Sequence, residues 1–228
     1  MSDLSSPARD AASAAAIELI EPGMALGLGS GRAVWRLVER LGDERPEDLR
    51  VVVASERTAA RVRGIGLEPL KLDGSLALDL AIDGADEIDP SLRLIKGGGG
   101  ALLREKIVVS AAARFVVVAE TPKKVARLGE DFRLPVEVVR FAWRDTRRRL
   151  APLLPDARLR LGDDGQPYIT DEGHFLLDCA LDENTDPDRL DAELNRVAGV
   201  VEHGLFVGMA ERALLGSPDG ELEVLEAR

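Results

Sequence analysis

Short apolar runs that alternate with helical segments constrain the fold of this chain more than any other feature. In the first 130 residues these runs fall at 24–28, 51–54, 78–82, 92–95 and 115–119. Helix signals stand between them, such as the Ser6-Pro7 cap that opens a helix reaching to about residue 20. This alternation is typical of a mostly parallel sheet with helices on both faces. We therefore predict an α/β fold with a Rossmann-like sheet.

The pattern changes near Asp131. The next elements that we expect are a strand at 136–139, a helix at 143–154, antiparallel strands at 158–161 and 167–180 with a turn at 171–173, and a helix at 186–197. This order predicts a smaller α+β domain at 131–204. The apolar runs at 205–207 and 213–216 are expected to return to the main sheet. The α/β domain would then comprise residues 1–130 and 205–228.

Composition excludes several classes of protein. The chain has 228 residues, 45% of them hydrophobic, and a net charge of −11, which disfavours a nucleic-acid partner. No apolar stretch approaches the roughly 20 residues of a membrane span, and the first 20 residues lack the basic flank of a signal peptide. Cys179 is the only cysteine, so no intramolecular disulfide can form. We expect a globular cytoplasmic protein with no membrane partner.

A glycine loop follows the first apolar run, as Gly27-Leu28-Gly29-Ser30-Gly31-Arg32. Such a loop between a strand and a helix presents backbone N–H groups to an anion, and a phosphate suits it. Its spacing matches neither the dinucleotide fingerprint nor the Walker loop. An ordinary turn is the alternative interpretation.

A second motif, residues 82–89, is rich in carboxylates. Asp83 and Asp86 are three residues apart on a Gly-Ala loop, so their carboxylates can converge on one site. Crowding would raise the pKa of one and leave a proton donor beside an acceptor. A helix cap or a metal loop are the alternatives, and without paired histidines or regular Asp spacing we expect no metal.

The third motif joins Lys96 and the glycines 97–100 to Glu105. In an arbitrary helix, Glu105 would belong to a solvated face. Here the helix begins at a glycine run, so its first turn is expected to face the same cleft as Lys96. By contrast, structural, surface or packing roles are expected for five other residues: His174, His203, Cys179, Trp35 and Trp143.

Together these motifs resemble the type A ribose-5-phosphate isomerase family over essentially the whole chain. The residues that carry the resemblance are 27–31, 83–87, 96–99, 104–107, 134–138, 199–201 and 204–206. The resemblance implies an aldose–ketose isomerase of the non-oxidative pentose phosphate pathway. It further implies no metal or organic cofactor, a small sugar phosphate as substrate, and a homodimer or homotetramer.

Roles for individual residues also follow from the resemblance. Glu105 falls on the proton acceptor of the family, which would move a proton between C2 and C1 of the sugar. Lys96 would stabilise the enediolate, and Asp83 or Asp86 would pass the second proton between the oxygens or help to open the furanose ring. The implied substrate-binding set is Ser30, Gly31, Arg32, Ala33, Asp83, Gly84, Ala85, Asp86, Lys96, Gly97, Gly98, Gly99 and Lys123.

The chain departs from the family at the phosphate end. Arg32 and Ala33 stand where the family usually has Ser-Thr, and Arg9 aligns with a lysine. The division of roles between Asp83 and Asp86, and the contacts of Arg32 and Arg9, therefore stay open. Two other functions also stay open, namely a sugar-phosphate-sensing regulatory module and an amino-sugar isomerase or deaminase.

Overall fold

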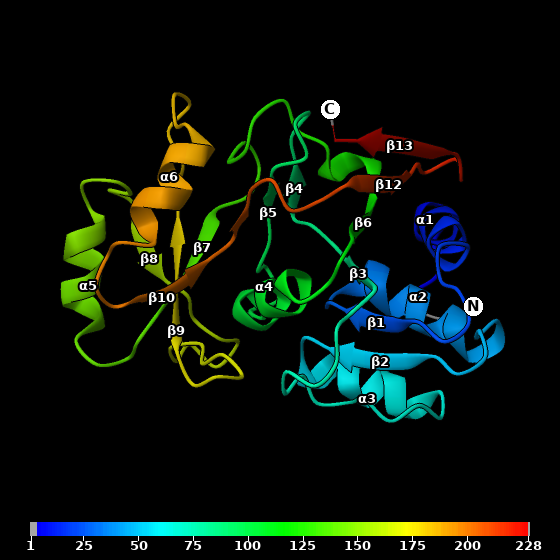
Figure 1. The fold of residues 1–228 in the computed structure, drawn as a ribbon. Coiled ribbons are helices and arrows are strands. Elements are labelled where there is room, and N and C mark those ends of the chain that lie inside the picture. The colour runs from blue at the N-terminus through cyan, green and yellow to red at the C-terminus, as the bar shows by residue number, and fades with distance from the viewer. Residues whose placement is uncertain (1–3, 228) are drawn as a thin grey trace.

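A six-stranded sheet forms the larger part of the protein, whose residues 4–227 are described by the computed structural model (Figure 1, right half). The strand order is β13-β12-β6-β3-β1-β2. These strands are β1 (Ala25–Leu28), β2 (Arg50–Val53), β3 (Leu80–Asp83), β6 (Phe115–Glu120), β12 (Arg212–Gly216) and β13 (Leu222–Glu226). Neighbours are parallel except for β12 with β13. The predicted α/β class with a mostly parallel sheet is therefore confirmed.

One face of this sheet is covered by α1 (Pro7–Ile17), α2 (Arg32–Asp43) and α3 (Glu56–Gly64). Serine caps start two of these helices: the Ser6 hydroxyl accepts a hydrogen bond from the N–H of Arg9, and Ser55 accepts one from Thr58. Alternate strand residues point to this face and pack against the helices, namely Leu26, Leu28, Leu80, Ile82, Val116 and Val118. Their neighbours in sequence point to the opposite face.

The opposite face is covered by α4 (Leu102–Ser110) and a small antiparallel sheet. Its order is β11-β5-β4, with β4 (Glu87–Ile88), β5 (Leu94–Ile95) and β11 (Leu205–Phe206). The prediction that 92–95 and 205–207 belong to the main sheet is therefore wrong. The link between β4 and β5 is too short for the crossover that parallel strands need, so these strands form a hairpin instead.

A four-stranded antiparallel sheet occupies the left half of Figure 1, beyond α4. Its order is β10-β7-β9-β8, with β7 (Leu134–Val138), β8 (Ala157–Leu159), β9 (Phe175–Cys179) and β10 (Val200–His203). Leucines of α5 (Trp143–Leu150) and α6 (Pro187–Leu194) pack on this sheet, and Cys179 is buried among them as predicted. None of the helices within residues 4–227 is long and apolar enough to cross a membrane.

The segment 167–180 forms a shorter strand than the sequence predicts. Only β9 is continuous, and 167–169 make isolated bridges, partly because Pro167 has no N–H to donate. The predicted turn is present, since Gly173 has a φ of +81° and its N–H donates to the Thr170 carbonyl at 2.8 Å. At the tip of this turn, Glu172 accepts a hydrogen bond from Arg104 of α4 at 2.6 Å. The turn thus ties the four-stranded sheet to α4.

Glu87 has a structural role within the carboxylate motif. Its side chain is 1% exposed and accepts hydrogen bonds from the backbone N–H groups of Gly129, Asp131 and Phe132 at 2.5–2.7 Å. The carboxylate thereby satisfies the loop that leads into β7.

Replacing Glu87 by Gln should destabilise the protein. The amide keeps the shape of the side chain but weakens three charge-assisted hydrogen bonds and turns an NH₂ group toward backbone donors. We expect a loss of about 1–3 kcal/mol in the free energy of unfolding, measured in urea. The matched control is Glu130→Gln on the exposed part of the same loop, which should change the value by less than about 0.5 kcal/mol. Equal urea midpoints of unfolding for the two variants would contradict the structural role assigned to Glu87.

Candidate active site

A cavity of about 380 Å³ opens at the carboxyl ends of β1, β3 and β6. This edge is where open parallel sheets bind ligands. The predicted site residues that line the cavity are Ser30, Gly31, Arg32, Ala33, Gly84, Ala85, Asp86, Lys96, Gly97, Gly98, Gly99, Glu105 and Lys123. Among the predicted residues, all of which lie in the described part of the chain, Asp83 alone is buried behind the wall.

A buried charge cluster forms one wall of the cavity. Lys96 Nζ lies 2.8 Å from Asp83 Oδ2 and 3.0 Å from Glu105 Oε2, and it donates to the Gly84 carbonyl at 2.8 Å. The three charged side chains are at most 5% exposed. Asp83 ends β3, Lys96 follows β5, and Glu105 lies in the first turn of α4. One element of the main sheet and two elements that cover its face therefore meet at one ammonium group.

Burial governs the protonation of this cluster. It raises the pKa of Glu105 to about 8, with a further increase from the charge of Asp83, while Lys96 opposes the shift. Burial alone would lower the pKa of Lys96, but the charges of Asp83 and Glu105 outweigh it and raise that pKa. The cluster therefore holds a permanent ammonium beside a carboxyl group that can exchange its proton near neutral pH.

Asp83 and Asp86 occupy different environments. Asp83 Oδ1 accepts hydrogen bonds from the N–H groups of Ser30 at 3.0 Å and Gly84 at 2.7 Å. A Cβ at Gly29 would lie 1.7 Å from Asp83 Cγ, so only glycine fits there. Asp86 is only half-buried and lines the cavity, where it accepts a hydrogen bond from the N–H of Gly98 at 2.7 Å. Asp83 thus supports Lys96, and Asp86 faces the cavity.

The N-terminus of α2 forms the other end of the cavity. Gly31 is the N-cap residue of this helix and has a φ of +105°. Because glycine has no side chain, no side-chain oxygen at the N-cap accepts a hydrogen bond from the N–H groups of the first turn. The Ser30 hydroxyl accepts a hydrogen bond from Ser55 at 3.0 Å. Arg32 is exposed and makes no ion pair with any residue in 4–227. A positive helix end beside a free arginine suits an anion.

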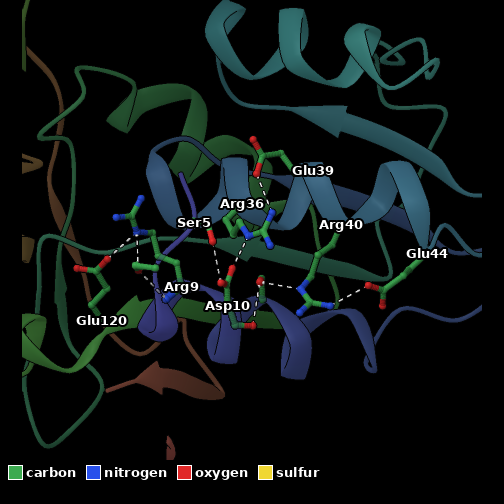
Figure 2. Close-up of polar contacts among 10 residues, drawn as sticks. Ser5, Arg9, Asp10, Arg36, Glu39, Arg40, Glu44 and Glu120 are labelled. Atoms are coloured by element: carbon green, nitrogen blue, oxygen red, sulfur yellow. Dashed lines mark hydrogen bonds and ion pairs between the residues drawn. The ribbon is translucent and has the colours of Figure 1, made fainter. Parts of the chain in front are cut away.

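Arg9 of α1 also lines this end of the cavity. Its Nε donates to Glu120 at 2.7 Å (Figure 2). The same Nε also donates to the Ser6 hydroxyl at 3.1 Å. Its Nη1 is buried and has no hydrogen-bond partner within the described residues. An ion pair between Asp10 and Arg36 ties α1 to α2 and so holds Arg9 in place (Figure 2).

Trp35 and Arg57 line the cavity, although no motif in the sequence predicts a site role for them. Arg57 Cζ lies 4.7 Å from the centroid of the Trp35 ring, and Arg61 Cζ lies 4.4 Å from it. The indole N–H donates to Thr58 Oγ1 at 3.1 Å. Trp35 is 7% exposed, so the predicted packing role holds, but both Trp35 and Arg57 also line the cavity. The available signal was the spacing of the two arginines, four apart on one face of α3.

Neither histidine lines the cavity. His174 Nδ1 lies 3.0 Å from Glu137 Oε1, and His203 is fully buried with its pKa lowered by burial to about 3. Both have the structural roles that were predicted. No cluster of His, Cys, Asp or Glu side chains suited to a metal ion occurs within residues 4–227.

Comparisons with known proteins agree with this geometry. The family model of ribose 5-phosphate isomerase A (phosphoriboisomerase A) matches residues 50–220. Ribose-5-phosphate isomerase A of Roseiflexus castenholzii is 49% identical over 92% of this chain and 91% of that protein, and its counterpart from Synechococcus sp. is 46% identical over 93% and 94%.

Two solved structures share the fold. A D-ribose-5-phosphate isomerase in complex with phospho-erythronic acid superposes with a TM-score of 0.91 at 33% identity, covering 96% of this chain and 97% of that one. Ribose 5-phosphate isomerase A from Methanocaldococcus jannaschii gives 0.89 at 33% identity with the same coverage. The chain belongs to the ribose-5-phosphate isomerase A family, the aldose–ketose isomerases that interconvert ribose 5-phosphate and ribulose 5-phosphate.

Proposed function

We propose that this chain interconverts D-ribose 5-phosphate and D-ribulose 5-phosphate through an enediolate, with Glu105 as the base. The observation that carries the proposal is the buried Glu105 carboxyl group, which lines the cavity 3.0 Å from the Lys96 ammonium. Glu105 takes the proton from C2 of the open-chain aldose and returns it to C1. A pKa raised by burial to about 8 suits a group that must both accept and release a proton near pH 7.

Lys96 stabilises the charge that develops on the carbonyl oxygen. Its ammonium is preorganised by Asp83 and by the Gly84 carbonyl, so little reorganisation is needed as the enediolate forms. A second proton must pass between the O1 and O2 oxygens. Asp86 is better situated for this transfer than Asp83, because Asp86 lines the cavity while Asp83 is 1% exposed behind Lys96.

The phosphate of the substrate is proposed to bind at the N-terminus of α2. Support comes from the uncapped first turn at Gly31, the Ser30 hydroxyl, the cavity-lining Lys123, and the buried Nη1 of Arg9 that lacks a protein partner within residues 4–227. Arg32 follows Gly31 directly and can add a charge-assisted hydrogen bond. The phospho-erythronic acid in the related structure is likewise a phosphorylated sugar derivative.

The isomerase assay is the direct test of this function. Purified protein in EDTA should convert ribose 5-phosphate to ribulose 5-phosphate, which a sugar-phosphate-sensing module would not do. An amino-sugar isomerase or deaminase would instead require an amino-sugar phosphate. Absence of conversion in EDTA would contradict the proposed isomerase function.

Glu105→Gln should lower kcat by about 10²–10⁴-fold, because the amide keeps the shape but cannot accept the proton. The measurement is steady-state turnover, with circular dichroism to check that the fold is retained. Glu44→Gln is the matched control and should keep wild-type turnover, because Glu44 caps the C-terminus of α2 in an ion pair with Arg40 and does not line the cavity.

The pH dependence of kcat/KM tests the role of Glu105 independently. The base must be deprotonated, and burial raises the pKa of Glu105 to about 8, so kcat/KM of the wild type should fall as the pH is lowered through that value. A profile that stays flat between about pH 6 and 9, or a Glu105→Gln variant with normal turnover, would exclude Glu105 as the base.

Arg32→Ala should raise KM for ribose 5-phosphate about tenfold, the equivalent of one charge-assisted hydrogen bond. The effect on unphosphorylated ribose should be smaller, and inhibition by inorganic phosphate should weaken. Arg148→Ala, at an arginine of α5 that is 80% exposed, is the control. Equal kinetics for wild type and Arg32→Ala would leave the phosphate to Ser30, Arg9 and the backbone.

We also infer that the protein is a cytoplasmic homodimer or homotetramer. The cytoplasm suits a chain whose single cysteine is buried and unpaired. Exposed apolar side chains support self-association, above all Phe141, which is 88% exposed. Light scattering at micromolar concentration should give at least twice the 24.6 kDa of one chain, and a monomer would contradict the inference.

A further inference from the structure

The glycine loop at 97–100 is held by a residue from the four-stranded sheet. Arg160, directly after β8, donates from Nη1 to the carbonyls of Gly97 at 2.9 Å and Gly98 at 3.1 Å. Its Nε donates to Asp178 of β9 at 2.9 Å, and its Nη2 forms a second bond to the same carboxylate. The Arg160 side chain is 14% exposed. The guanidinium is therefore fixed on one side by Asp178 and bound on the other side to two successive loop carbonyls.

A second residue of the same region holds the next carbonyl. The Tyr168 hydroxyl donates to the Gly99 carbonyl at 3.2 Å. A Cβ at Gly100 would lie 2.3 Å from that hydroxyl oxygen, and Gly100 has a φ of +83°, so the ring packs on a position that only glycine fits. Three successive carbonyls of the loop thus accept hydrogen bonds from residues outside it.

The other side of the loop belongs to the cavity, because Gly97, Gly98 and Gly99 line it. A carbonyl and the N–H of the following residue share one peptide group. Arg160 therefore binds the oxygen ends of the two peptide groups whose N–H ends belong to Gly98 and Gly99. The N–H of Gly98 donates to Asp86 at 2.7 Å, whereas the N–H of Gly99 has no protein acceptor within residues 4–227.

We propose that Arg160 is a positioning residue for the isomerase reaction: it holds and polarises these two peptide groups, so that the Gly99 N–H donates to the enediolate oxygen and Asp86 keeps its orientation. A positive charge at the carbonyl end strengthens the N–H end as a donor. Preorganised donors act mainly where charge develops in the transition state. This proposal rests on the proposed function, since it concerns the same enediolate.

The first test replaces Arg160 by Met, which keeps an apolar stem and removes the donors. We expect kcat to fall about 10–100-fold, in the range for partners that act through another group, with a smaller change in KM. Arg158→Met is the matched control, because Arg158 lies on β8, is 66% exposed and pairs only with Asp156 within the described residues. Arg158→Met should keep the wild-type values of kcat and KM.

Two further measurements separate positioning from general stability. Guanidinium ion at a low, non-denaturing concentration should partly restore kcat of Arg160→Ala and should do nothing for Glu105→Gln. Amide hydrogen exchange at 97–100 should be faster in Arg160→Met and unchanged in Arg158→Met. The exchange readout does not depend on turnover, so it still tests Arg160 if the protein shows no isomerase activity and the proposed function fails.

If Arg160→Met fails to fold, Asp178→Asn tests the same point, because it leaves a neutral acceptor and loosens the guanidinium. Asp178→Asn should also lower kcat, but by a smaller factor than Arg160→Met. Wild-type kcat in a folded Arg160→Met protein would overturn the proposal, and so would a rise in KM alone. Unchanged exchange at 97–100 would overturn it as well.

Discussion

The cost of burying a charged lysine governs much of this structure. Lys96 is 2% exposed, and an ammonium removed from water is tolerated only when opposite charges and acceptors surround it. Asp83 and Glu105 supply the charges, and Gly84 supplies a carbonyl. The end of β3, the loop after β5 and the first turn of α4 must therefore converge. The same convergence creates a base, an ammonium and a cavity wall, so stability and chemistry depend on one arrangement.

Close backbone approach makes this convergence possible. A Cβ at Gly29 would overlap Asp83, and one at Gly204 would lie 2.2 Å from the Lys96 carbonyl oxygen. The N–H of Lys96 donates to the Gly204 carbonyl at 2.9 Å, which fixes the lysine backbone against the segment between β10 and β11. The glycines beside Lys96 are then held from the far side by Arg160 and Tyr168. The site is thus enclosed by parts of all three sheets, although the buried charge cluster of Asp83, Lys96 and Glu105 comes from only two short stretches of sequence.

The sequence predicts whatever depends on local pattern. The apolar runs at β1, β2, β3 and β6 identify the parallel sheet, and the motifs that follow two of the runs do line one cavity. Pairings between distant residues escape such reasoning. The local sequence gives no sign that Glu87 and its neighbour Asp86 have different roles. Only the structure shows that Glu87 accepts hydrogen bonds from a loop more than 40 residues away. In the sequence, Arg160 is indistinguishable from any other strand arginine, and only its hydrogen bond to the Gly97 carbonyl distinguishes it. Leu94–Ile95 has the composition of a main-sheet strand, but the tight turn before it makes it pair with β4 in a separate sheet.

The order of the strands bears on how the chain folds as it leaves the ribosome. β6 ends at Glu120, but its sheet neighbour β12 begins only at Arg212. At a synthesis rate of ~5–20 residues per second, the apolar edge of β6 stays unpaired for roughly 5–20 seconds while the four-stranded sheet is being made. An open edge of the sequence Phe-Val-Val-Val-Ala-Glu can pair with another nascent chain. The speed of translation across residues 121–211 therefore sets how long this protein is exposed to aggregation before its main sheet closes.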